Sequence, residues 1–251
     1  MIADMLRIAV LGGTVTADRS AGWSLMLSQP LVGACLAGAL VNPGPEWELW
    51  ALRVPLGVGA LLQLLLTDAS LPAAQRQHDT AAAGVVGSAV GLLAMSRLHG
   101  TVPISAGGLL WVLIGVVAGL AAAVGGGWVM RFHRTLSRVD VERARDLVAR
   151  GAIGSFEWLY WGGVLRAFAL GAAWSWGATL LGLAAALALL PPLAPALTGR
   201  RIGFLFAAVL GTGLAVAYHA HVKGRRGGAK WAALGAAAAL VLGTLWRGET
   251  L

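Results

Sequence analysis

The sequence predicts an all-α, polytopic transmembrane helical bundle, and three features lead to that prediction. Of the 251 residues, 58% are hydrophobic and only 12% are charged, whereas a soluble domain carries about 25% charged residues. The mean hydropathy is +0.76. The apolar residues gather in runs that approach the ~20 residues needed for a membrane-spanning helix. We therefore treat residues 1–251 as a single integral membrane domain in contact with a lipid bilayer.

About seven or eight hydrophobic elements are expected along the chain. One is a weak opening segment, and the others are apolar runs without interior charge: Leu25–Val41, Val54–Leu66, Ala81–Met95, Val102–Met130, Val164–Leu190, Ile202–Ala220 and Trp231–Trp246. The proline-rich stretch LLPPLAPALTG predicts a re-entrant or interfacial segment rather than a full helix. The 36 glycines predict close helix packing, because small residues let backbones approach each other.

Charge and cysteine content exclude several classes of protein. The net charge of +8 resides mostly in short stretches between apolar runs, which is typical of cytoplasmic loops and argues against nucleic-acid binding. The single cysteine, Cys35, has no partner in the chain for a disulfide or a cysteine metal site. The opening MIADMLRIAVLGG lacks the pattern of a cleaved signal peptide, so we expect it to belong to the mature chain.

Two basic clusters predict the orientation in the membrane. The arginines of Arg131–Arg150 and the basic residues of Lys223–Lys230 should both face the cytoplasm. The first cluster also carries Asp140, Glu142 and Asp146 at helical spacing, which predicts a short amphipathic helix on the membrane or against a partner; a solvated loop helix fits equally well. Several of the 11 tryptophans stand near segment ends, as interfacial anchors do.

Polar residues inside or beside the apolar runs mark two candidate sites. The first contains Asp18 and Ser24, and the second contains Gln63, Asp68 and Asp79. Polar groups at membrane depth are costly unless they face a cavity, a partner helix or a substrate. Three alternatives remain open: Asp18 and its neighbour Arg19 pair with other groups at a helix end, Gln63 joins helices by its amide, and Asp79 caps the helix that follows it.

No catalytic centre is visible in the sequence. The five histidines are scattered, and the serine-nucleophile, zinc-helix and phosphate-loop motifs are all missing. We expect no catalytic residue, no metal site and no cofactor, and hence a protein that is not itself an enzyme.

Two stretches resemble a known family of transporters. The run DRSAGWSLMLSQPLVGACLAGALVNP, from Asp18 to Pro43, resembles the opening of the membrane subunit IIC of the mannose, fructose and sorbose family of bacterial phosphoenolpyruvate-dependent sugar phosphotransferase systems. The run VGALLQLLLTDASLPAAQRQHDTAAA, from Val58 to Ala83, is similar to that family's Leu-Glu-Leu helix and its later Pro-Asp pair. The spacing from Gln63 to Asp79 agrees, and weaker likeness continues along most of the chain.

This resemblance implies a sugar permease subunit in the bacterial cytoplasmic (inner) membrane, with several crossings. In the family, IIC assembles with a membrane subunit IID into an oligomer, and soluble IIA and IIB components phosphorylate the transported sugar. The implied substrate-binding residues are Gln63 and Asp79, with Asp18, Ser24 and Asp68 in weaker roles. The chain departs from the family at four positions: Gln63 replaces glutamate, Gln29 replaces arginine, His78 replaces proline and Ser24 stands near a usual glutamine.

Two other functions compete with transport. The four departures favour a diverged scaffold or regulatory subunit that no longer transports sugar. A membrane enzyme acting on lipid or prenyl groups ranks last, because such enzymes need paired acids or a metal cluster that the sequence lacks.

Overall fold

The computed structural model describes residues 2–21, 26–41, 48–66, 79–98 and 108–218, together with Gly235 and Ala237. Every regular element in these residues is helical, so the predicted all-α class is confirmed. The seven α-helices are α1 (Ile2–Ala21), α2 (Pro30–Leu40), α3 (Glu48–Leu65), α4 (Thr80–Leu98), α5 (Leu109–Ala149), α6 (Ile153–Leu193) and α7 (Gly199–Tyr218). Each of the first seven predicted hydrophobic elements overlaps one helix; most of the eighth lies outside the described residues.

Three of the described helices are long and apolar enough to cross a membrane. They are α5, α6 with the turn that follows it, and α7. Helices α2, α3 and α4 contain shorter apolar stretches. The length and composition of these helices therefore support the prediction of a membrane protein.

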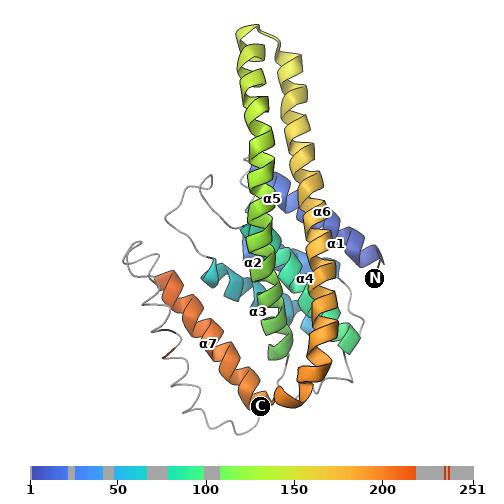
Figure 1. Cartoon of the computed structure of the whole chain (residues 1–251), viewed down its shortest axis with the longest axis vertical. Coiled ribbons are helices and arrows are strands. Elements are labelled where there is room, and N and C mark those ends of the chain that lie inside the picture. Colours follow the sequence, from blue (N-terminus) through green and yellow to red (C-terminus); the bar gives the residue numbers. More distant parts are fainter. Residues whose placement is uncertain are drawn as a thin grey trace.

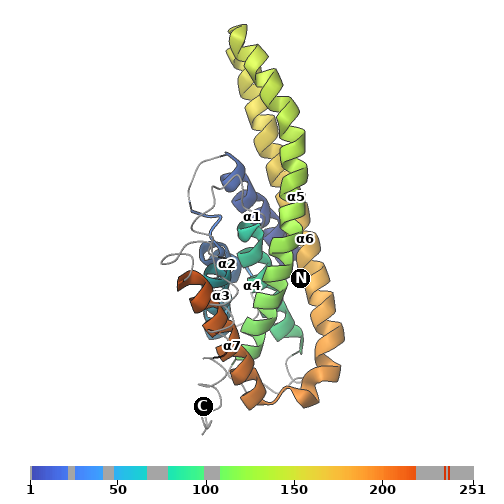
Figure 2. The same ribbon diagram turned by 60° about the vertical axis from the view of Figure 1, so that its left-hand side comes forward.

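Helices α5 and α6 form a long antiparallel hairpin that stands out from the rest of the molecule. Each has 41 residues, or about 60 Å of helix. Their outer halves extend well beyond α1 to α4 in both views (Figures 1 and 2). The predicted short amphipathic helix at Arg131–Arg150 is therefore wrong: this stretch is the outer half of α5, continuous with its apolar half. The reason is that no glycine or proline interrupts the chain from Met130 until Gly151, whose φ of 67° ends the helix.

The proline-rich stretch after α6 also differs from its prediction. Helix α6 continues through Pro191 and Pro192, and a single 3-10 turn at Ala194–Ala196 leads to α7. The two prolines lie in the last turn, where the loss of their N–H groups limits further helix growth. A tight turn, rather than a re-entrant segment, thus joins α6 to α7, while an interfacial position of this turn stays a prediction. Helix α7 returns on the side of α3, which it packs against more than against α5 (Figure 1).

Helices α1 to α4 and the apolar halves of α5 and α6 form the lower body of the molecule. Its helices pack through glycines, as the composition predicts. Helix α1 lies along α6, and α4 lies along α5. At the α4–α5 contact, a Cβ built on Gly87 would lie 2.6 Å from the carbonyl oxygen of Gly115 and 3.0 Å from Val58 Cγ1 of α3. Gly12 of α1 meets Ser175 of α6 so closely that no Cβ would fit there. Gly87 thus brings the backbones of α4 and α5 together, and Gly12 lets the Ser175 side chain reach the backbone of α1, so neither position has space for a larger side chain.

This packing predicts opposite effects for two glycine substitutions in helices. Gly87→Ala should lower the stability of the protein by about 1–3 kcal/mol through overpacking, even though alanine favours helix. The matched control is Gly177→Ala in α6, where an added Cβ meets no atom within 4 Å, and stability should be unchanged or higher. Thermal unfolding of both purified variants in the same detergent measures the difference. Equal unfolding midpoints for the two variants would contradict this account of the core.

Candidate functional site

The candidate site is a buried polar junction where α1, α4, α5 and α6 meet. Its centre is an ion pair between Arg19, near the end of α1, and Asp79, just before α4. Arg19 Nη1 lies 3.2 Å from Asp79 Oδ1, and the side chains are 9% and 3% exposed. Asp18, beside Arg19 in the chain, is 2% exposed. Charges so far from water are costly unless they are paired, so this junction is a specific feature of the fold.

Asp79 holds this position through its own backbone and side chain. Its N–H donates to the carbonyl of Ala123 in α5 over 2.9 Å. Its Oδ1 accepts from the N–H of Ala82 at 3.3 Å, which is the geometry of a helix N-cap. The alternative that Asp79 caps the following helix is thus confirmed, and the same carboxylate oxygen also pairs with Arg19.

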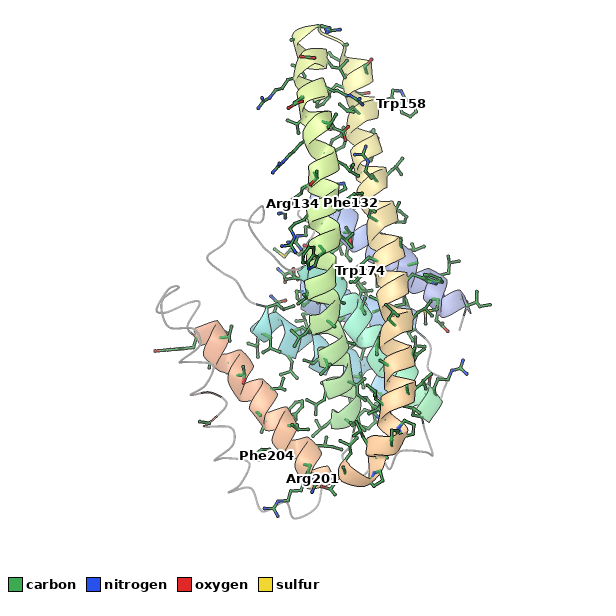
Figure 3. The ribbon with its side chains drawn as sticks, in the orientation of Figure 1. Phe132, Arg134, Trp158, Trp174, Arg201 and Phe204 are labelled. Carbon is green, nitrogen blue, oxygen red and sulfur yellow. The ribbon has the colours of Figure 1, made fainter. Side chains whose placement is uncertain are left out.

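Two glycines of α5 make room for the junction. A Cβ on Gly126 would lie 2.6 Å from Asp79 Cβ and 3.0 Å from Trp174 Nε1, and a Cβ on Gly125 would collide with the Trp174 ring. Trp174 of α6 donates from Nε1 to the carbonyl of Ala122 over 3.2 Å. Figure 3 shows Trp174 between the two long helices, below the projecting part of the hairpin. One turn of α5 therefore seats both Asp79 and Trp174.

Buried hydroxyl groups extend the polar interior away from the ion pair. Ser175 and Thr179 of α6 and Ser88 of α4 are fully buried. Their hydroxyl oxygens have no hydrogen-bond partner within the part of the chain that the structure describes. Thr16 of α1 is also buried, against Gly171 of α6. Hydroxyls are tolerated in an apolar bundle at some cost, and they offer donors and acceptors to a polar ligand.

The structure brings together some of the predicted site residues but not all of them. Asp18 and Asp79 both lie at the junction. Gln63 is half-buried on α3, with its amide oxygen enclosed. Its neighbour Leu62 packs on Gly119, two turns of α5 or about 10 Å from Gly126. Ser24 and Asp68 lie outside the described residues.

Sequence reasoning gave Arg19 and Trp174 no place among the site residues. Arg19 was considered only as a helix-end group, and pairing of that kind is confirmed, with Asp79 as the partner. Trp174 carried a signal, because it stands inside an apolar run rather than at its end. The triple glycine at Gly125–Gly127 was a second signal, since three adjacent glycines inside a helix need a packing reason.

The side chains at the junction can recognise a polar ligand by hydrogen bonds. Among the described residues, no group of three or more histidine, cysteine, aspartate or glutamate side chains could hold a metal ion. A carboxylate, a guanidinium and an indole N–H can orient polar groups of a ligand by hydrogen bonds. The chain matches no protein-family model, no curated protein and no solved structure.

Removal of one partner of the buried ion pair should be far more damaging than removal of both. Arg19→Leu leaves the Asp79 carboxylate without its cation and should cost about 3–5 kcal/mol of stability. The double change Arg19→Leu with Asp79→Asn removes both charges and keeps a capping side chain, so it should recover part of that loss. The measurement is the midpoint of unfolding, by heat or denaturant, of each variant in the same detergent.

The chain offers a matched control for this experiment. Arg166 of α6 pairs with Asp140 of α5 at 2.8 Å on the projecting hairpin, and its side chain is 34% exposed. Arg166→Leu should cost only about 1 kcal/mol, because this pair stays partly in contact with water and so contributes less than a buried pair. The change Asp79→Asn is also made alone. If the double variant loses as much stability as Arg19→Leu and Asp79→Asn lose together when made separately, Arg19 and Asp79 do not depend on each other.

Proposed function

We propose that this chain is the IIC-like membrane subunit of a bacterial sugar permease. It binds and translocates a sugar across the cytoplasmic membrane together with a IID-type subunit. Soluble IIA and IIB components phosphorylate the sugar, so the phosphoryl transfer takes place on partners and not on this chain.

The buried junction of Arg19, Asp79 and Asp18 is the observation that carries this proposal. Sugars are recognised by carboxylates, amides and guanidinium groups that hydrogen-bond their hydroxyls in a site sheltered from water. The junction supplies two of those groups inside an otherwise apolar bundle, and Trp174 lies beside it. Asp79 is also one of the two positions that the family resemblance implies.

Gln63 is assigned to the same site as a second polar anchor. Helix α3 around it is apolar on both sides, so its amide is the one strongly polar side chain from Val58 to Leu66. Both α3 and the start of α4 pack against the glycine-rich face of α5. A ligand that reached from Asp79 toward Gln63 would therefore run along this face of α5.

A scaffold that does not transport is the second candidate, and one observation favours it. Arg19 and Asp79 are already paired with each other, and Asp79 also caps α4. If these groups only pair with each other and cap α4, the junction stabilises the fold and binds no ligand. In that case changes at Arg19 or Asp79 alter the stability of the complex, and no sugar binds at any concentration.

Substitution of Gln63 tests the sugar site directly. Gln63→Leu should weaken sugar binding by about 1–3 kcal/mol, or roughly ten- to a hundredfold in affinity, because a ligand hydroxyl loses its partner. Gln63→Glu restores the residue of the resembled family and should keep or improve uptake. The assay is binding and uptake of radiolabelled hexose by the complex with its IID partner, measured with thermal stability.

Thr212→Val in α7 is the matched control for Gln63→Leu. The Thr212 hydroxyl donates to the carbonyl of Ala208 within its own helix, so sugar affinity should not change. If Gln63 instead joins helices, Gln63→Leu lowers stability or IID association while the folded complex binds sugar normally. Unchanged sugar affinity in the leucine variant would remove Gln63 from the site.

We also propose an orientation, which rests on the basic clusters and on the course of α6 and α7. If each of these helices crosses once, the hairpin tip and the region after Tyr218 lie on the same side of the membrane. Both predicted basic clusters then face the cytoplasm, as the positive-inside rule requires. The turn between α6 and α7 faces outward. Lys223–Lys230 itself lies outside the described residues.

Cysteine labelling in intact cells tests this orientation. In a Cys35→Ala background, a membrane-impermeant thiol reagent should label Thr198→Cys, in the turn before α7, and should not label Ser155→Cys near the hairpin tip. Ser155 is exposed in the structure, so disruption of the membrane should make the cysteine reactive. Labelling of the tip from outside would reverse the orientation.

A further inference from the structure

We infer that the outer half of the α5–α6 hairpin is the docking surface for a soluble protein with an acidic surface. The surface consists of residues Arg131–Ala149 of α5 and Ile153–Arg166 of α6. The inference rests on the membrane placement proposed above but not on sugar transport itself. Four features of the hairpin carry it.

The first feature is the exposure of large apolar residues on the outer part of α6. On α6, Trp158 is 83% exposed, Trp161 is 50% exposed and Leu165 is 65% exposed. Their spacing of three and four residues places them on one face of the helix. Figure 3 shows Trp158 projecting outward from α6, away from α5. An exposed apolar stripe of this kind marks a site of interaction.

The second feature is distance from the membrane. The apolar half of α5 ends at Met130, and Trp128 beside it is 68% exposed with the Arg131 guanidinium 4.3 Å from its ring centroid, as at a lipid–water interface. Asp140 lies ten residues further, about 15 Å along the helix, and pairs with Arg166. Trp158 lies eight residues closer to the tip than Arg166, which adds about 12 Å to its distance from Met130. The headgroup layer is only about 5–8 Å thick, so Trp158 stands beyond it and is not a membrane anchor.

The third feature is charge. From Arg131 to Arg166 the hairpin has seven arginines and four acidic residues. The resulting net charge of +3 attracts an acidic partner. It also disfavours a second copy of this chain, because two such hairpins would repel each other.

The fourth feature is the type of exposed residue. Tryptophan and arginine are the residues that most often dominate protein–protein binding energy. Arg138, Arg143 and Arg145 are all exposed on α5, and Trp158 is the most exposed large side chain of α6. Two helices side by side are only about 20 Å wide, so one globular partner is large enough to contact Trp158 on α6 and these arginines on α5 together.

Site-specific photocrosslinking of the full chain in its own cells tests the inference. The photoreactive residue p-benzoylphenylalanine replaces Trp158, and the matched control replaces Leu181, which is 72% exposed in the apolar part of the same helix. At position 158 we expect an adduct with one soluble protein that carries a net negative charge. At position 181 we expect no adduct with that protein. Reversal of three charges, Arg138→Glu, Arg143→Glu and Arg145→Glu, should reduce the adduct by about tenfold or more.

Each other outcome overturns the docking proposal. These outcomes are an adduct with a second copy of the chain, adducts with lipid alone, a partner without net negative charge, and a yield that charge reversal leaves unchanged in a variant with normal thermal unfolding. Absence of any adduct while the complex still takes up sugar would also overturn it. Conversely, an acidic partner crosslinked to a chain that binds no sugar would support docking and contradict the permease.

Discussion

The ion pair between Arg19 and Asp79 constrains much of the lower body. Two charges that are almost fully buried must lie within 3.2 Å of each other, because either charge alone would be costly in an apolar bundle. This requirement fixes where α1 ends and where α4 begins. It also brings the Asp79 backbone to the Ala123 carbonyl, which ties the start of α4 to α5.

Close approach of backbones follows from that constraint. Asp79 and Trp174 both press on one turn of α5, and only residues without a Cβ fit at positions 125 and 126. The same solution recurs along the bundle, at Gly87 against Gly115 and at Gly12 against Ser175. Small residues therefore do two jobs here: they pack the helices, and they make space for the few large polar groups at the junction.

Hydropathy predicted the helical class and the approximate position of each described helix, because apolar runs of this length have few alternatives. It failed where a helix continues past the end of its apolar part. The helix at Arg131–Arg150 was expected as a separate element because hydropathy drops after Met130, yet backbone hydrogen bonding continues as long as no residue interrupts it. The absence of glycine and proline was the informative signal, and it outweighed the change in polarity.

The junction was only partly predictable, for a different reason. The cost of polar groups at membrane depth marked Asp18 and Asp79 as site candidates, and both are buried in the structure. The partner of Asp79 did not, since Arg19 is 60 residues away and nothing in a single sequence indicates which distant helix ends meet. Trp174 was likewise recognisable as unusual, but its contact with Gly125 depends on the register between α5 and α6, which the sequence pattern leaves undetermined.

The continuity of α5 and α6 has a mechanical consequence. From Gly126 to the end of α5 at Ala149 the helix runs without a break for about 35 Å, so this part behaves as a lever whose pivot lies within the bundle. A tilt of about 5° at Gly126 would move the far end by roughly 3 Å, by simple proportion to that length. Any rearrangement at the turn of α5 that seats Asp79 and Trp174 is thus amplified at the hairpin tip, and a load applied at the tip is transmitted back to the same turn.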